Sequence, residues 1–181
     1  MTREQAYNLA KPRFSNKNLF KHVLAVEAVM RELALVLEQD VEEWGLTGLL
    51  HDLDYEETMN TPEQHTLVTE KILRDYDVPK EIVHAIKSHN NLAPHEHLLD
   101  RALYAADPIT GLIVAAALMH PDKKLASIDS DFVLRRFKEK SFARGANREQ
   151  IKSCEAFGLS LQDFTAISLR AMQKISDELG L

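Results

Sequence analysis

Apolar residues recur along this chain at the three- and four-residue intervals that are typical of amphipathic helices. No stretch alternates apolar and polar residues between the Asn-Gly or Asp-Gly turns that join hairpin strands. The pattern therefore predicts an all-α protein. We next ask which polar residues interrupt the apolar faces of the expected helices, because such residues carry the chemistry of a site.

The first long helix is predicted to begin at the capping pair Ser15-Asn16 and to run to about Glu38. Its apolar line consists of Val26, Val29, Leu33 and Val36. His22 lies on the same line, four residues before the first of these valines. A histidine is thus expected on the inward face of this helix.

A second helix is predicted from Val41 to His51 or Asp52, with Trp44 and Leu49 turned inward. Its last two residues lie about 100° apart around the helix axis, so both can face one cavity. One imidazole nitrogen and one hard carboxylate oxygen suit a first-row divalent metal at a hydrolytic site. Two ligands need partners from other segments of the chain.

A third helix is predicted to start at Thr61-Pro62, where Thr is the N-cap, Pro is the first helical residue and Gln64 takes the capping-box position. Its inward face begins with His65 and continues through Val68 and Ile72. This segment therefore adds a second separated histidine to the interior.

A fourth helix is predicted to open at Val78-Pro79. Its inward residues Ile82 and Ile86 lead directly to His89. His84 lies on the opposite side of this helix, so we expect solvent around it. Of the two histidines, we expect His89 to be the ligand.

An alanine-rich helix is predicted from Leu98, and Asp107 interrupts its apolar face immediately before Pro108. Proline removes a helical hydrogen bond and disfavours α geometry at the preceding residue, so we expect a kink or break near Asp107. The longest apolar run, about residues 111–119, is then too short to span a bilayer. A final helix over about 160–179 is predicted to close the core.

Length and charge narrow the classes of function. With 181 residues, the chain can bury a core without disulfides or a structural metal, which favours one domain. The net charge of −6 gives no general basic field, so we expect no stable nucleic-acid binding. Cys154 is the only cysteine, which excludes a disulfide framework or a cysteine-based zinc site within the chain. No segment is typical of a signal peptide, and we expect a soluble, cytoplasmic protein with no membrane partner.

The candidate ligands follow the order H…HD…H…H…D from His22 to Asp107, and this pattern resembles the HD superfamily of metal-dependent phosphohydrolases. The local sequences resemble that family too: Lys21-His22-Val23, Gly48-Leu49-Leu50-His51-Asp52, His65 with Val68 and Ile72, Ala85-Ile86-Lys87-Ser88-His89, and Ala106-Asp107. The resemblance implies one HD-like helical domain over residues 1–181, with a metal-ligand core at about 16–120 and a C-terminal helical extension at about 121–181.

The resemblance also implies one or two divalent metal ions, whose identity among Mn, Fe, Co, Zn, Ni and Mg stays open. Four residues match the ligands of the family's basic metal site: His22, His51, Asp52 and Asp107. His65 and His89 match the additional histidines of its dinuclear members. With two metals present, Asp52 is expected to bridge them.

On this resemblance we expect a phosphatase or phosphodiesterase that acts on a small phosphorylated compound, such as a nucleotide or a related phosphoester. His51 and Asp52 carry its chemistry, because the metal they hold generates hydroxide and polarises a phosphoryl oxygen. Two alternatives stay open. One is a diiron oxygenase, since some relatives with six ligands use O2, and the other is a non-catalytic regulatory module that binds metal. The oligomeric state is open as well.

The run after His51-Asp52 departs from the best-known variant of the family. Leu53-Asp54-Tyr55 stands where that variant has Ile-Gly-Lys, whose lysine can reach phosphate. Phosphate contacts are therefore expected from the basic segment near the C-terminus, at Lys138, Lys140 and Arg144. The acidic loop 54–60 is expected to be solvated, with the alternative that Asp54, Glu56 or Glu57 includes an acid or base that supports the site. The Gly-Tyr-Pro signature of cyclic-di-GMP phosphodiesterases is absent after His89, which disfavours that substrate.

Overall fold

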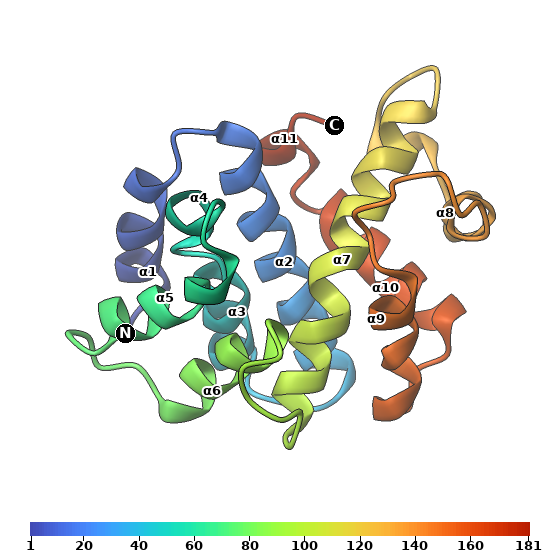
Figure 1. Cartoon of the computed structure of the whole chain (residues 1–181). Helices are drawn as coiled ribbons and strands as arrows, with labels where there is room; N and C mark the ends of the chain where they lie inside the picture. Colours follow the sequence, from blue (N-terminus) through green and yellow to red (C-terminus); the bar gives the residue numbers. More distant parts are fainter.

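The computed structural model describes residues 1–181 and contains helices but no strand, which confirms the all-α class (Figure 1). The longer helices are α2 (Lys17–Val36), α3 (Val41–Leu50), α6 (Lys80–His89), α7 (Leu98–Met119) and α10 (Leu161–Gln173). The shorter helices are α1 (Arg3–Ala10), α4 (Tyr55–Thr58), α5 (Leu67–Leu73), α8 (Ser130–Phe137), α9 (Arg148–Lys152) and α11 (Ser176–Leu179).

The first two predicted helices are confirmed, and side chains fix where they begin. The side chain of Asn16 accepts a hydrogen bond from a backbone amide in the first turn of α2, and Asp40 does the same for α3. The two helices pack with their backbones close together at Gly48, where an added Cβ would lie 2.8 Å from the Cα of Glu27. This approach brings the end of α3, with His51, beside α2.

The helix predicted from Thr61 begins later. Residues Pro62–Gln64 form a single 3-10 turn without a side-chain cap from Thr61, and α5 starts only at Leu67. Thr66 lies between them with a left-handed φ of 71°, which is costly for a β-branched residue. His65 therefore sits on an irregular segment, and the capping signal at Thr61 serves a turn.

Of the kink or break predicted near Asp107, the break does not occur, because α7 continues through Pro108. Pro108 is buried among the helices that pack around α7, and this packing offsets the lost hydrogen bond. The 22 residues of α7 are long and apolar enough to cross a bilayer, but 56% of its most apolar window is buried inside the bundle. The core helix of a globular bundle meets the same criteria.

The C-terminal helices share a core with the central ones. Phe164 and Met172 of α10 are buried in the cluster that α2 and α7 form, and Figure 1 shows α10 beside both helices. A second, smaller cluster joins α1, α3, α5 and α6. The predicted final helix is interrupted, since α10 ends at Gln173 and Ile175 precedes the short α11.

Candidate metal centre

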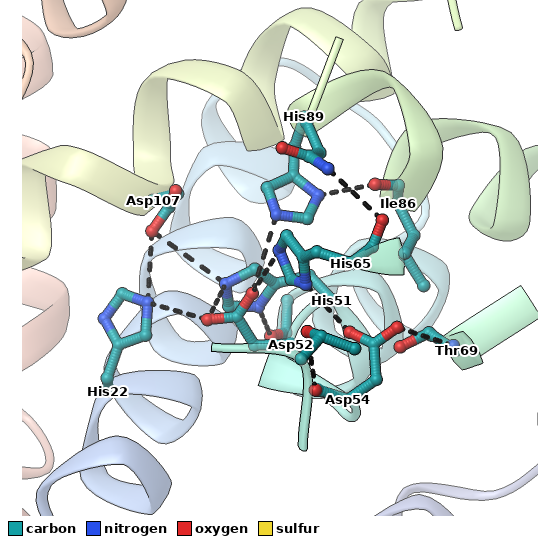
Figure 2. A network of polar contacts seen from close by, with 12 residues as sticks. His22, His51, Asp52, Asp54, His65, Thr69, Ile86, His89 and Asp107 are labelled. Atoms are coloured by element: carbon teal, nitrogen blue, oxygen red, sulfur yellow. Dashed lines mark hydrogen bonds and ion pairs between the residues drawn. The ribbon is translucent and has the colours of Figure 1, made fainter. Parts of the chain in front are cut away.

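Six side chains from five segments meet around the end of α3, and Asp52 lies at their centre (Figure 2). Its Oδ2 lies 3.4 Å from His51 Nε2 and 3.7 Å from His22 Nε2. Its Oδ1 lies 3.3 Å from His65 Nε2 and 3.5 Å from His89 Nε2. The two oxygens of one carboxylate thus face two different groups of imidazoles.

Asp107 completes the first of these groups. Its Oδ1 lies 3.1 Å from His22 Nε2 and 3.9 Å from His51 Nε2. The structure therefore brings together every residue of the predicted ligand set: His22, His51, Asp52, His65, His89 and Asp107. Their division is the one expected of two adjacent metal positions that share Asp52.

All four histidines use Nδ1 for a contact that points away from Asp52. His51 Nδ1 donates to the carbonyl of Gly48 at 2.8 Å, and His89 Nδ1 donates to the carbonyl of Ile86. Thr110 Oγ1 donates to the carbonyl of Asp107 at 2.9 Å, so at 3.1 Å from His22 Nδ1 it accepts the proton of that nitrogen. Each contact fixes the tautomer that leaves the Nε2 lone pair directed at the cluster.

Asp54 performs the same task for His65. Its Oδ1 accepts from His65 Nδ1 at 2.8 Å, while its Oδ2 accepts from the backbone amide of Thr69 at 2.8 Å. The amide of Asn90 also donates to the carbonyl of His65 at 3.2 Å. Asp54 is fully buried, so the expectation that the acidic loop is solvated is wrong for this residue. Its position two residues after Asp52 is the signal in the sequence that sets it apart from the other acids of this loop.

The histidines of the cluster differ in their pKa values. Burial, together with the neighbouring His89 and His22, lowers the pKa of His51 to about 4, so its ring is neutral near pH 7. Burial also opposes protonation of His65, but hydrogen bonds with Asp52 and Asp54 outweigh it and raise the pKa of His65 to about 9. His51 is thus ready to bind a cation, whereas His65 must first release a proton.

The donor atoms fit a divalent metal. His51 Nε2 is buried and has no hydrogen-bond partner, although polar atoms in that position are normally satisfied. Lone pairs of imidazoles and carboxylates face one another across the cluster, an arrangement that a cation between them stabilises. The ligand atoms of His22, His51 and Asp107 lie within 4.8 Å of one another, as do those of His51, Asp52 and His89.

The cluster is accessible from the side of α2 and α7. The side chains of His22 and Asp107 are 24% and 31% exposed, whereas His51, Asp52 and His89 are buried. A cavity of about 540 Å³ adjoins His22 and Thr110 at this side. Its remaining walls include Asn18, Lys21, Ala25, Val114 and Leu179.

The structure does not bring the predicted phosphate contacts Lys138, Lys140 and Arg144 to the cluster. They belong to the segment between α8 and α9, which lies across α7 from α3 and α4 in Figure 1. Arg148 holds this segment together, because its guanidinium donates to the carbonyls of Phe137, Glu139, Phe142, Ala143 and Ala146. His84 is also absent from the cluster, but it is half-buried beside Asp100 instead of solvated as expected.

Comparison with known proteins identifies the family of this chain. The model of the family described as HD domain matches residues 19–117. Ribonuclease Y from Nitratidesulfovibrio vulgaris is 31% identical over 96 residues, which cover 53% of this chain and 18% of the relative. Ribonuclease Y from Desulfotalea psychrophila is 27% identical over 168 residues, covering 90% of this chain and 32% of the relative. The chain thus spans a third or less of these relatives. No solved structure gave a significant match.

Proposed function

Because this chain belongs to the HD-domain family of metal-dependent phosphohydrolases, we propose that it hydrolyses the phosphoester of a nucleotide or a similar small phosphorylated compound. The observation that carries the proposal is the Asp52 carboxylate, whose two oxygens face two separate groups of Nε2 atoms. His22, His51, Asp52 and Asp107 would hold one divalent ion, and Asp52, His65 and His89 a second. Such ions lower the pKa of a bound water and polarise a phosphoryl oxygen.

The chain's own residues supply orientation and charge balance. The Nδ1 contacts of His22, His51, His65 and His89 keep four Nε2 atoms aimed at one centre. Asp52 and Asp107 offset the positive charge of the ions, and the buried walls limit access of water to the open side. Because Asp107 and His22 are the exposed ligands, the reacting phosphate approaches between α2 and α7.

The cavity at this open side supports a small substrate. At about 540 Å³ it has room for a group the size of a nucleoside. Lys21 lines this cavity and is the residue immediately before His22. Its Nζ donates to the carbonyl of Leu179 at 2.7 Å. We assign to Lys21 the phosphate contact that the family's best-known variant obtains from a lysine after its HD pair.

The first experiment compares metal content and phosphatase activity of the wild type with Asp52→Ala and His51→Ala. We expect both variants to keep their helical circular dichroism while the metal held by the cluster around Asp52 is lost and turnover of a chromogenic phosphoester falls to background. His120→Ala is the matched control, because His120 lies at the end of α7, outside the cluster. Wild-type turnover by metal-free Asp52→Ala would refute the proposal, and so would two bound irons with O2-dependent turnover and no phosphatase activity.

A second experiment separates a small substrate from RNA, which the names of the Ribonuclease Y relatives suggest. Purified protein is given nucleoside monophosphates, dinucleotides and a single-stranded RNA of about twenty residues under one metal condition. We expect the highest kcat/KM for the small compounds, because the net charge of −6 opposes binding of a polyanion. Lys21→Gln should raise KM for them several-fold with little change in kcat. Faster cleavage of the RNA would replace the small-substrate proposal with a ribonuclease.

A further inference from the structure

A second group of potential ligands lies outside the metal centre, where the middle of α6 packs against the start of α7. His84 comes from α6, while His97 and Asp100 come from the N-cap and first turn of α7. One nitrogen of each imidazole and one oxygen of the carboxylate lie within 4.8 Å of one another. None of these three residues belongs to the cluster around Asp52.

Asp100 is the buried member of this group, and its charge lacks adequate partners. The side chain is fully buried, and its Oδ1 has no hydrogen-bond partner. Its Oδ2 accepts from the backbone amides of Glu96 and His97 at 3.1 and 2.8 Å. A buried carboxylate oxygen without a donor loses its hydration and gains nothing in return, so such an atom needs an explanation.

Neighbouring cations do not provide that partner. Arg101 donates to the carbonyls of His95 and Glu96, and Lys87 pairs with Glu70 at 3.2 Å. The side chain that faces Asp100 is His84, whose Nδ1 lies 3.2 Å from Asp100 Oδ2. That nitrogen is itself buried and makes no properly directed hydrogen bond. A simple ion pair therefore leaves both residues incompletely satisfied.

We propose that His84, His97 and Asp100 form a second, structural metal site that takes a borderline-soft divalent ion such as Zn²⁺. Two imidazoles and one carboxylate are typical zinc ligands, and ligand atoms of a tetrahedral site lie roughly 3.3 Å apart when the bonds are about 2.0 Å long. The separation of 3.2 Å between His84 Nδ1 and Asp100 Oδ2 matches this edge, and a carboxylate that binds the ion through both oxygens would also give Oδ1 its missing partner. The fourth position would be open to water, because His97 is exposed.

Glu96 supports this assignment from the other side of the ring. Its Oε2 lies 4.0 Å from His84 Nε2, the nitrogen that points away from Asp100. A carboxylate at this place favours a proton on Nε2 and so leaves the lone pair on Nδ1 for the metal.

An ion at this site would hold α6 against α7. His84 shares α6 with His89, and Asp100 shares α7 with Asp107, so each joined helix also carries a ligand of the main centre. The segment between the two helices, residues 90–97, contains no regular element and ends at His97. The site would therefore fasten two ligand-bearing helices at the point where only an irregular loop connects them.

The test counts zinc ions, because stoichiometry separates this site from the main centre. Chelator-stripped protein is titrated with Zn²⁺ in equilibrium dialysis, and bound metal is measured by elemental analysis. Variants are His97→Ala and His84→Ala, each also combined with Asp52→Ala, and His120→Ala is the matched control. We expect each site variant to bind one equivalent less than its parent, in both backgrounds, while His120→Ala loses none.

Thermal unfolding gives an independent readout that does not require turnover. In the Asp52→Ala background, saturating Zn²⁺ should raise the Tm, because binding to the folded state alone stabilises it. Adding His97→Ala should abolish that rise, and since His97 is exposed, this variant is expected to fold. An unchanged zinc count and an unchanged Tm rise in His97→Ala would overturn the proposal, whether or not the main centre proves to be a phosphohydrolase.

Discussion

Asp54 shows how a single residue changes character between sequence and structure. By composition it belongs to an acidic loop, yet its carboxylate is fully buried and joins His65 to the amide of Thr69. Although burial raises the pKa of a carboxyl group, the hydrogen bonds from His65 and Thr69 outweigh it and hold the pKa of Asp54 below its ordinary value. Asp54 is therefore charged at neutral pH and acts as the positioning residue for His65.

We predict that Asp54→Asn weakens the second metal position and spares the first. The amide no longer provides the charge that orients His65, and losses of such outer contacts typically cost about 10–100-fold in metal affinity. Isothermal titration of chelator-stripped protein should show two binding events at the centre around Asp52. We expect Asp54→Asn to lower the metal affinity of only one of them, the event that belongs to His65 and His89. Asp75→Asn, at an exposed residue, is the matched control. Equal losses at both events would contradict this assignment.

Helix boundaries were predictable where the capping residues and the packing of the helix favour the same start. Asn16 and Asp40 cap α2 and α3 as their positions in the sequence indicate, and periodicity placed His22 and His89 on inward faces. Thr61 carries an equally strong capping signal, but the chain turns at Thr66 to deliver His65 to the cluster. Capping preference contributes about 1 kcal/mol, and tertiary contacts of the site exceed it.

Pro108 does not end the helix, because tertiary packing again outweighs a local preference. Its cost in a helix, about 3 kcal/mol, is real, but α7 packs against helices on several sides and the burial of its apolar residues is worth more. The pairing of His84 with Asp100 was unpredictable in another way, because helix periodicity fixes directions around one axis and says nothing of which helix lies opposite. The types of the ligand residues and their order in the sequence predicted the centre around Asp52. The group of His84, His97 and Asp100 depends instead on how α6 and α7 pack against each other.

Gly48→Ala is predicted to destabilise the protein and to disturb the main centre together. The new Cβ would lie 2.8 Å from the backbone of Glu27, so α2 and α3 must separate, and overpacking of this kind costs about 1–3 kcal/mol. Urea unfolding should report the lower stability and metal titration the weaker affinity. Gly145→Ala, where a Cβ meets no atom within 4 Å, serves as control and should change neither.

The link between α2 and α10 predicts a pH-dependent contribution to stability. Although burial opposes ionisation of Glu32, hydrogen bonds from Lys174 at 2.6 Å and Arg170 at 2.9 Å hold its pKa below 4.5. A lowered pKa in the folded state stabilises the protein above about pH 4.5, and this contribution disappears as the pH falls through the folded pKa.

Glu32→Gln should therefore lower the free energy of unfolding by about 1–2 kcal/mol at pH 7, since both cations are partly exposed. The difference from wild type should shrink when urea unfolding is repeated at pH 4 and then at pH 3. A difference that stays constant over this range would show that the charge of Glu32 is not its cause.

At the scale of the whole molecule, the helices beyond the family match complete the core. The match ends at residue 117, yet Phe164, Ile167, Leu169 and Met172 of α10 are buried against α2 and α7. At about 1.5–3 kcal/mol for each buried side chain, these four contribute roughly 6–12 kcal/mol. This equals the entire net stability of many domains, which is about 5–15 kcal/mol.

We therefore predict that a chain ending at residue 120 does not fold cooperatively, in agreement with the expectation of one domain over residues 1–181. Circular dichroism during urea titration should show a broad, non-cooperative transition, and metal affinity should be lost with it. Removing only residues 1–13, which belong to the smaller cluster, is the comparison and should leave a cooperative transition. A sharp transition in the chain that ends at residue 120 would instead define residues 1–120 as an autonomous unit.

The position of Leu179–Leu181 in the wall of the cavity beside His22 has a practical consequence for producing the protein. A polyhistidine tag fused after Leu181 would begin at the mouth of the cavity, where its imidazoles can reach the exposed ligands and compete for the ion being measured. The first residue lies elsewhere, with its amino group on the carbonyl of Asp77 at 2.8 Å, and Figure 1 shows the two ends of the chain on different sides. A cleavable tag at the N-terminus keeps the histidines of the tag away from the metal centre.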